Sequence, residues 1–238
     1  MKIYFINNTI IYIILLLLVF SIAMMLILYK NYYKTEEIFL PITNKIVAID
    51  PGHGGVDPGA VSKSGLTEDE INLKIALKLK RFIEQSGGIA ILTREDDKGL
   101  YTDQSTTLGQ KKVEDLHNRR KLIEESQAEI FVSIHLNSFT RPGYFGAQTF
   151  YSETHEENQA LAYILQEELK NVLDKENKRQ PAIREDVYII KDMEIPSVLI
   201  EAGFLSNQDE ARLLDTSDYQ EKIAWSIYVG IMKYFNTE

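Results

Sequence analysis

Three side chains that can bind a metal ion or carry protons follow short apolar segments of this sequence. His53 comes shortly after an apolar run that ends at Asp50, and His135 and Glu201 each close another such run. Runs of this kind predict buried β-strands. Open α/β sheets bind ligands beyond the carboxyl ends of their strands. We therefore expect these three side chains to meet at one edge of a sheet.

The residues around His53 suit the presentation of a metal ligand. In the segment Asp50-Pro-Gly-His-Gly-Gly55 the glycines remove side-chain bulk and allow a sharp backbone path. A catalytic zinc ion takes three protein ligands and keeps one position open. The sequence has no cysteine, so the ligands must come from its four histidines and its acids. His117 and His155 lie among charged residues and are expected to be solvated surface positions.

Glu68 is the carboxylate that we expect to complete the ligand set. It lies in the first turn of a predicted helix, where Thr67 and Glu70 have the spacing of a capping box. Asp69 points to a different face of that helix, which leaves Glu68 free to reach inward. The alternative is that Glu68 only complements the helix dipole, and the local pattern leaves both interpretations open.

The elements that must position these side chains alternate between strand and helix. Strands are predicted over 46–50, 89–92, 130–135, 145–151 and 198–201, and helices from 67 to the glycine pair at 87–88 and over 116–125, 158–173 and 219–235. The polar segment 98–112 is interpreted as a surface excursion. This alternation predicts an α/β fold in three layers, with a largely parallel twisted sheet flanked by helices on both faces.

An apolar N-terminal segment precedes this fold. From Ile10 to Tyr29 the residues are almost all Ile, Leu, Val, Phe and Met, and about 20 such residues span a bilayer as a helix. A cleaved signal peptide is the alternative, but its shorter apolar region would be followed by small residues, which are missing here. We predict a membrane anchor or uncleaved signal at 1–30, a tether at 31–44 and a catalytic domain at 45–238.

The charge of the chain argues against nucleic acid as a partner. The formal net charge is −9. Residues 1–40 contribute three lysines and two glutamates, or +1, so the remainder carries −10. Binding to phosphates requires clustered Lys and Arg, which an acidic domain of this kind does not provide. The absence of cysteine excludes disulfides but leaves the compartment open.

Four motifs in order resemble those of the zinc-dependent N-acetylmuramoyl-L-alanine amidases. They are Asp50-Pro-Gly-His-Gly-Gly55, Gly65-Leu-Thr-Glu-Asp-Glu-Ile-Asn-Leu73, Ser133-Ile-His-Leu-Asn-Ser138 and Ile200-Glu-Ala-Gly-Phe-Leu-Ser-Asn207. The resemblance covers about residues 45–235 and is strongest to the spore-cortex branch, which takes part in forming muramic lactam. Glu124 and Leu136 depart from the family pattern, and neither is a proposed ligand.

The resemblance implies a set of roles. His53, Glu68 and His135 would hold Zn²⁺, and Glu201 would be the catalytic carboxylate that moves protons. If Glu201 only bonded Asn207 or a backbone N–H, another base would be needed, and no serine nucleophile elbow is present. Two imidazoles and a carboxylate also suit cobalt or manganese.

The same resemblance implies a substrate and a location. The substrate would be peptidoglycan, cut between N-acetylmuramic acid and L-alanine, with the catalytic domain outside the cytoplasmic membrane, in the forespore envelope. Alternatives are a zinc peptidase that cuts within the stem peptide and a non-catalytic wall-binding protein. An envelope lipoprotein is a candidate partner. Asn137 either binds substrate or the metal shell or only shapes its turn. Some members of the family insert an autoinhibitory helix after the strand that ends at Tyr151; here the helix predicted from Asn158 follows within a few residues, so we expect no self-blocked site.

Overall fold

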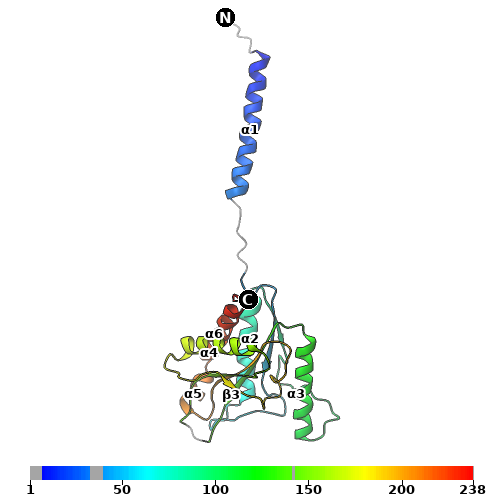
Figure 1. The fold of residues 1–238 in the computed structure, drawn as a ribbon, viewed down its shortest axis with the longest axis vertical. Coiled ribbons are helices and arrows are strands. Elements are labelled where there is room, and N and C mark those ends of the chain that lie inside the picture. The colour runs from blue at the N-terminus through cyan, green and yellow to red at the C-terminus, as the bar shows by residue number, and fades with distance from the viewer. Residues whose placement is uncertain (1–6, 33–39, 141–142, 238) are drawn as a thin grey trace. The chain divides into compact units, whose positions relative to one another are not determined.

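The computed structural model describes residues 7–32, 40–140 and 143–237, and it divides into two units, the second of which begins at Leu40. Helix α1 (Asn8–Tyr32) belongs to the first unit (Figure 1). Its segment Asn8–Tyr29 has a mean hydropathy of 3.1, with no side chain buried in the protein. By length and composition this segment can cross a membrane, although a signal sequence has the same properties.

The second unit is built on one six-stranded sheet. Its strands are β1 (Ile46–Pro51), β2 (Ile89–Leu92), β3 (Ile130–Asn137), β4 (Gln148–Tyr151), β5 (Ala182–Ile183) and β6 (Ser197–Phe204). Their order across the sheet is β2-β1-β3-β6-β4-β5. The first four strands in this order are parallel, and β4 runs antiparallel to β6. The predicted fold class is confirmed, but β4 and β5, which are parallel to each other, run antiparallel to the other four strands.

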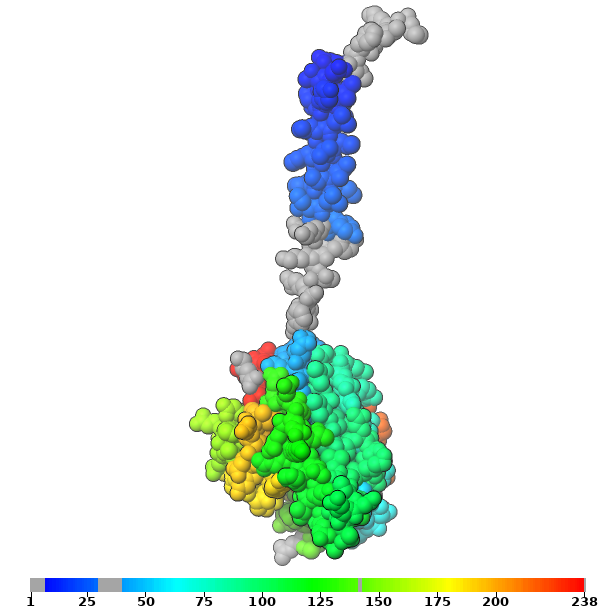
Figure 2. Space-filling model, turned by 90° about the vertical axis from the view of Figure 1, so that its right-hand side faces the viewer, coloured from blue at the N-terminus to red at the C-terminus, as the bar shows by residue number. Residues whose placement is uncertain are grey.

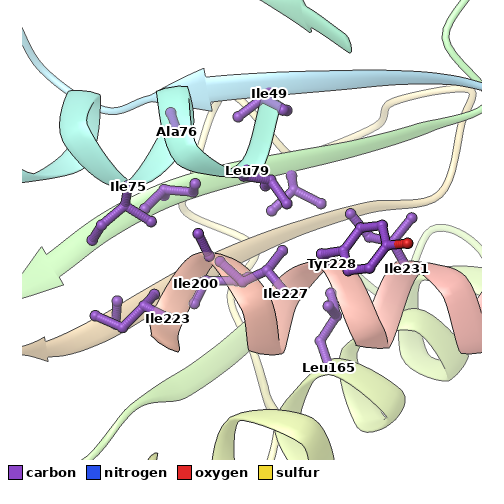
Figure 3. Packing of buried hydrophobic residues seen from close by; sticks show 14 of the residues in the cluster. Ile49, Ile75, Ala76, Leu79, Leu165, Ile200, Ile223, Ile227, Tyr228 and Ile231 are labelled. Carbon is purple, nitrogen blue, oxygen red and sulfur yellow. The ribbon is translucent and has the colours of Figure 1, made fainter. Parts of the chain in front are cut away.

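Helices cover both faces of this sheet. They are α2 (Glu68–Gln85), α3 (Leu108–Glu125), α4 (Glu156–Leu173), α5 (Gln208–Leu214) and α6 (Ser217–Phe235). Figure 1 shows α3 on one side of the sheet and α2, α4 and α6 on the other. Figure 3 shows α2 and α6 packed against the strands, with Ile75, Ile227 and Ile231 among the buried contacts.

The alternation of side chains along the central strands separates two cores. In β3, Ile130, Val132 and Ile134 point toward the large core under α2, α4 and α6. Phe131, between them, joins a smaller core together with Ile123 of α3. Because successive strand residues face opposite sides, His135 falls on the α3 face with Phe131. The functional residues at the strand ends therefore continue the smaller core.

The structure corrects the start of one helix. Helix α3 begins at Leu108, eight residues before the predicted start at 116, and takes up the end of the supposed excursion at 98–112. Thr107 accepts a hydrogen bond from the Gln110 N–H, and the Gln110 side chain bonds back to Thr107, which is a complete capping box. The Thr-x-x-Gln spacing was a usable sequence signal.

The predicted capping box at the start of α2 is wrong. Thr67 is the N-cap residue but makes no side-chain cap hydrogen bond, and Glu70 bonds Lys74 instead. The sequence analysis also missed β5 and α5, which are short. Ile42 is fully buried in the large core, so the packed part of the second unit begins before the predicted boundary at residue 45.

Candidate active site

The register between β3 and β6 places two site residues side by side. His135 of β3 is paired with Glu201 of β6. Because parallel partners in register face the same side, both side chains point toward α3. The register shifts between His135 and Asn137, which marks an irregularity just beyond the histidine. Both residues lie in the carboxyl-terminal halves of their strands, but β3 continues to Asn137 and β6 to Phe204, beyond the predicted ends at 135 and 201.

Two arginines hold the loop that carries His53. Arg119 of α3 donates hydrogen bonds to the carbonyl oxygens of Pro51 (2.9 Å) and His53 (2.6 Å). Arg94 donates to the carbonyl oxygens of Pro51 (2.9 Å) and Gly52 (3.1 Å). His53 has φ = 63°, a conformation that costs a non-glycine residue energy. The arginine contacts compensate for this strain and fix the direction of the imidazole.

Arg119 is itself buried and neutralised. Its guanidinium bonds Asp50 at 2.8 Å and Asp115 at 2.8 Å. Asp50 also accepts hydrogen bonds from Thr93 (2.6 Å) and Ser133 (2.8 Å). Burial alone would raise the pKa of Asp50, but Arg119 and Thr93 hold it below its usual value. The result is a rigid ionic support beneath the His53 loop.

His53, Glu68 and His135 converge on one point. Their ligand atoms all lie within 4.8 Å of one another. Glu68 Oε1 is 3.0 Å from His135 Nδ1 and 3.3 Å from His53 Nε2. In a tetrahedral zinc site with bonds of 2.0–2.1 Å, two ligand atoms are about 3.3 Å apart. The two distances from Glu68 and the donor set, two imidazoles and one carboxylate, therefore fit a mononuclear zinc ion.

Small residues make this convergence possible. A Cβ atom at Gly52 would overlap the imidazole of His135. At Gly59, where φ is +66°, a Cβ atom would lie 2.6 Å from Glu68 Oε2 and 2.7 Å from His53 Cδ2. Backbone donors orient Glu68 as well: Leu136 N–H bonds Oε1 at 2.9 Å and Ala60 N–H bonds Oε2 at 2.8 Å.

Asp57 orients His53. The His53 Nδ1–H donates to Asp57 Oδ2 at 3.0 Å, and Lys112 Nζ lies 2.7 Å from Asp57 Oδ1. A hydrogen bond at Nδ1 selects the tautomer that leaves Nε2 for a metal ion. Sequence analysis did not identify Asp57. Its spacing of four residues from a loop histidine was the only local signal.

The charges of the ligands are coupled. Burial would lower the pKa of His53, but its contacts with Glu68 and Asp57 raise it to about 9. Burial would raise the pKa of Glu68, yet hydrogen bonds with His135 and His53 hold it far below the usual range. Glu68 is therefore a carboxylate at neutral pH, and its charge attracts a proton or a cation to this point.

Glu201 differs from Glu68 in the direction of its pKa shift and in its hydrogen bonding. Burial, reinforced by the negative charge of Glu68, raises the pKa of Glu201 to about 7. Its Oε2 atom is buried and has no hydrogen-bond partner among the described residues. A carboxylate with a pKa near neutrality can both accept and return a proton. Asn207 is not its partner, because the Asn207 side chain caps α5.

A pocket of about 300 Å³ opens beside these residues. His53, His135 and Glu201 line it, together with residues of α3 and of the segment 184–189. Arg120 of α3 donates to the carbonyl oxygens of Tyr188 and Lys191, which ties that segment to the helix. Figure 2 shows α3 in green beside the yellow-to-orange segment that precedes β6.

The remaining candidates lie elsewhere. His117 and His155 are exposed, as expected, and neither belongs to the ligand cluster. Asn137 does not line the described pocket, and its carbonyl oxygen accepts a hydrogen bond from Leu205 N–H. These contacts involve only the backbone of Asn137, so both interpretations of its side chain stay predictions.

Three candidate metal ligands beside an unpartnered carboxylate, at the carboxyl edge of an α/β sheet, are typical of mononuclear metal-dependent hydrolases. Comparison with known families narrows this class. Residues 47–233 match the family model described as N-acetylmuramoyl-L-alanine amidase. The chain therefore belongs to the N-acetylmuramoyl-L-alanine amidase family.

Individual relatives agree with this assignment. The germination-specific N-acetylmuramoyl-L-alanine amidase of Bacillus subtilis is 38% identical over 215 residues, covering 89% of this chain and 90% of the relative. The structure of the CwlD amidase from Clostridioides difficile, in complex with the GerS lipoprotein, has a TM-score of 0.80 at 52% identity. The match covers 82% of this chain and 100% of the CwlD chain. The catalytic domain of CwlV from Bacillus (Paenibacillus) polymyxa has a TM-score of 0.68 at 30% identity. The match covers 82% of this chain and 99% of the CwlV domain.

Proposed function

We propose that this chain is a zinc-dependent amidase that hydrolyses the bond between the lactyl group of N-acetylmuramic acid and L-alanine of the stem peptide. The observation that carries the proposal is the convergence of His53, Glu68 and His135 beside Glu201. The family membership supplies the substrate class.

The residues of the chain would act in distinct ways. His53, Glu68 and His135 hold the zinc ion, which when bound makes water more acidic and polarises the scissile carbonyl. Asp57 keeps the His53 ring in the orientation that presents Nε2. The pocket between α3 and the segment 184–189 receives the substrate and excludes bulk water from one side of the site.

Glu201 would carry the protons of the reaction. Its free Oε2 accepts a proton from the attacking water and later returns it to the leaving amine of L-alanine. The pKa of about 7 belongs to the metal-free site, and a bound dication lowers it because positive charge favours the carboxylate. Glu201 is then ionised at neutral pH, as a proton acceptor must be.

Mass spectrometry of digested peptidoglycan tests this function. The zinc-loaded protein should release intact stem peptides that begin with a free L-alanine amine. Internally cut stem peptides would instead identify a zinc peptidase, and an unaltered polymer that retains bound protein would identify a wall-binding protein. Either result would overturn the proposal.

We also propose that this protein acts in the spore cortex. Its N-terminal helix would anchor it in the cytoplasmic membrane, with the catalytic domain outside. The similarity to a germination-specific amidase supports the cortex role, and the apolar segment Asn8–Tyr29 supports the anchor. Spores that lack this protein should contain cortex without muramic lactam. A normal muramic lactam content would contradict the cortex role while leaving the amidase activity intact.

An envelope lipoprotein is the partner that we propose. The support is a similar amidase whose structure was solved with the GerS lipoprotein. A tagged form of the chain should capture a lipoprotein from forespore membranes, and that lipoprotein should bind the purified second unit in sedimentation experiments. If the tagged chain captures no lipoprotein, the proposed partner is refuted.

A further inference from the structure

The pocket beside the candidate metal site contains eight lining residues that carry formal charge, histidines aside. They are Asp50, Asp57, Lys111, Lys112, Asp115, Arg119, Arg184 and Glu201. Most of these charges are neutralised within the protein. A charge in the pocket that has no partner is available to a ligand.

Three of the four cations have carboxylate partners. Lys112 lies 2.7 Å from Asp57, and Arg119 is bonded to Asp50 and Asp115. Arg184 makes two hydrogen bonds to Asp186, at 2.7 and 3.0 Å. These pairs also account for every carboxylate that lines the pocket except Glu201, the proposed proton carrier.

Lys111 is the fourth cation, and it differs from the others. Its side chain is half-buried, and its ammonium lies 5.0 Å from the centre of the Tyr101 ring. No carboxylate lies within ion-pair distance of it among the residues that the structure describes. The ring favours the cation but leaves its hydrogen-bond donors unused. Lys111 and Glu201 are thus the unpaired opposite charges of one pocket.

We propose that Lys111, held over Tyr101, binds a free carboxylate of the stem peptide while the scissile amide lies at Glu201. This inference rests on the proposed function. The sugars of the substrate are neutral, and the lactyl carboxyl is consumed in the amide, so its anionic groups near the cut are peptide carboxylates. Glutamate, the residue after L-alanine, offers the first of them when its α-carboxyl is not amidated.

Two soluble muropeptides that differ in one group test the inference. One carries the free α-carboxylate on glutamate, and the other carries a carboxamide there. The zinc-loaded protein should cut the free-carboxylate form with kcat/KM about tenfold higher, mainly through KM, as expected for one charged contact. The preference should shrink as ionic strength rises, because salt screens the contact.

Matched variants assign the preference to one residue. Lys111→Gln should reduce the ratio between the two substrates to about one, and Lys111→Arg should retain most of it. Lys121→Gln is the control, because Lys121 is an exposed residue of the same helix that does not line this pocket. Zinc content, measured for each variant, should remain equal.

The outcomes separate the two levels of the proposal. A protein that cuts both muropeptides equally well, or a Lys111→Gln variant that retains the full preference, would overturn the inference and leave the amidase function standing. A zinc-loaded protein that cuts neither muropeptide would overturn the proposed function and this inference with it.

Discussion

Replacement of Glu201 by glutamine should separate proton transfer from metal binding. Glutamine preserves the size of the side chain but cannot take up a proton. Glu201 Oε2 makes no hydrogen bond within the described residues, so the change breaks no contact there. Hydrolysis should fall by about 10²-fold or more, the usual contribution of a general base. The zinc content should remain at one ion per chain.

The same change should stabilise the metal-free protein. The folded-state pKa of Glu201 lies at about 7, above the ordinary value of 4.5. Ionisation of this group therefore opposes folding, and the penalty grows as the pH rises from 4.5 to 7 and is complete above 7. A shift of this size corresponds to roughly 3 kcal/mol. Denaturant unfolding of the metal-free protein at pH 8 should show a more stable Glu201→Gln variant.

Glu68→Gln should behave differently in kind. Both oxygens of Glu68 accept backbone hydrogen bonds, from Ala60 and Leu136, and an amide nitrogen would face one of these donors. The variant should lose stability by about 1–3 kcal/mol and bind zinc weakly, with partial recovery of activity in excess zinc. If Glu201→Gln were metal-free and rescued by zinc, while Glu68→Gln kept its metal, the two roles would be reversed.

Four other results are expected. His53→Ala and His135→Ala should abolish zinc binding, whereas His117→Ala and His155→Ala should preserve it. Equal metal content in all four variants would refute the ligand set. Asp57→Ala should weaken zinc binding by about 10- to 100-fold, because the His53 ring loses its orienting acceptor; an unchanged dissociation constant would exclude that role. The proton on His53, whose pKa is about 9 without metal, competes with zinc, so affinity should rise by about tenfold per pH unit between pH 7 and 9, with proton release in calorimetry; a flat pH profile would contradict this. A chain that begins at Leu40 should fold without detergent. In a chain that begins at Thr43, the free energy of unfolding should be lower by about 2 kcal/mol, because the buried side chain of Ile42 is missing. Equal free energies of unfolding would show that Ile42 contributes little.

Part of this site was accessible to local reasoning. The sequence indicates His53, His135 and Glu201 because each comes at or after the end of an apolar run, and the strand ends of a parallel sheet share an edge. The structure brings these residues together for that reason. The expectation that Glu68 is a ligand depends in part on a capping role of Glu70, and Glu70 does not cap the helix. Its position in the first turn of α2 was nevertheless sufficient to bring it to the histidines.

The sequence by itself determined the alternation of strands and helices, the apolar N-terminal segment and the residues at the strand ends, because each depends on neighbours a few positions away. The tertiary structure decided the antiparallel direction of β4 and β5, the pairing of His135 with Glu201 and the opposite pKa shifts of Glu68 and Glu201. It also decided that Arg94 and Arg119 hold the His53 loop and that Lys111 lacks an acidic partner in the pocket. These features depend on contacts between residues far apart in the chain, and local patterns do not specify which distant side chains meet.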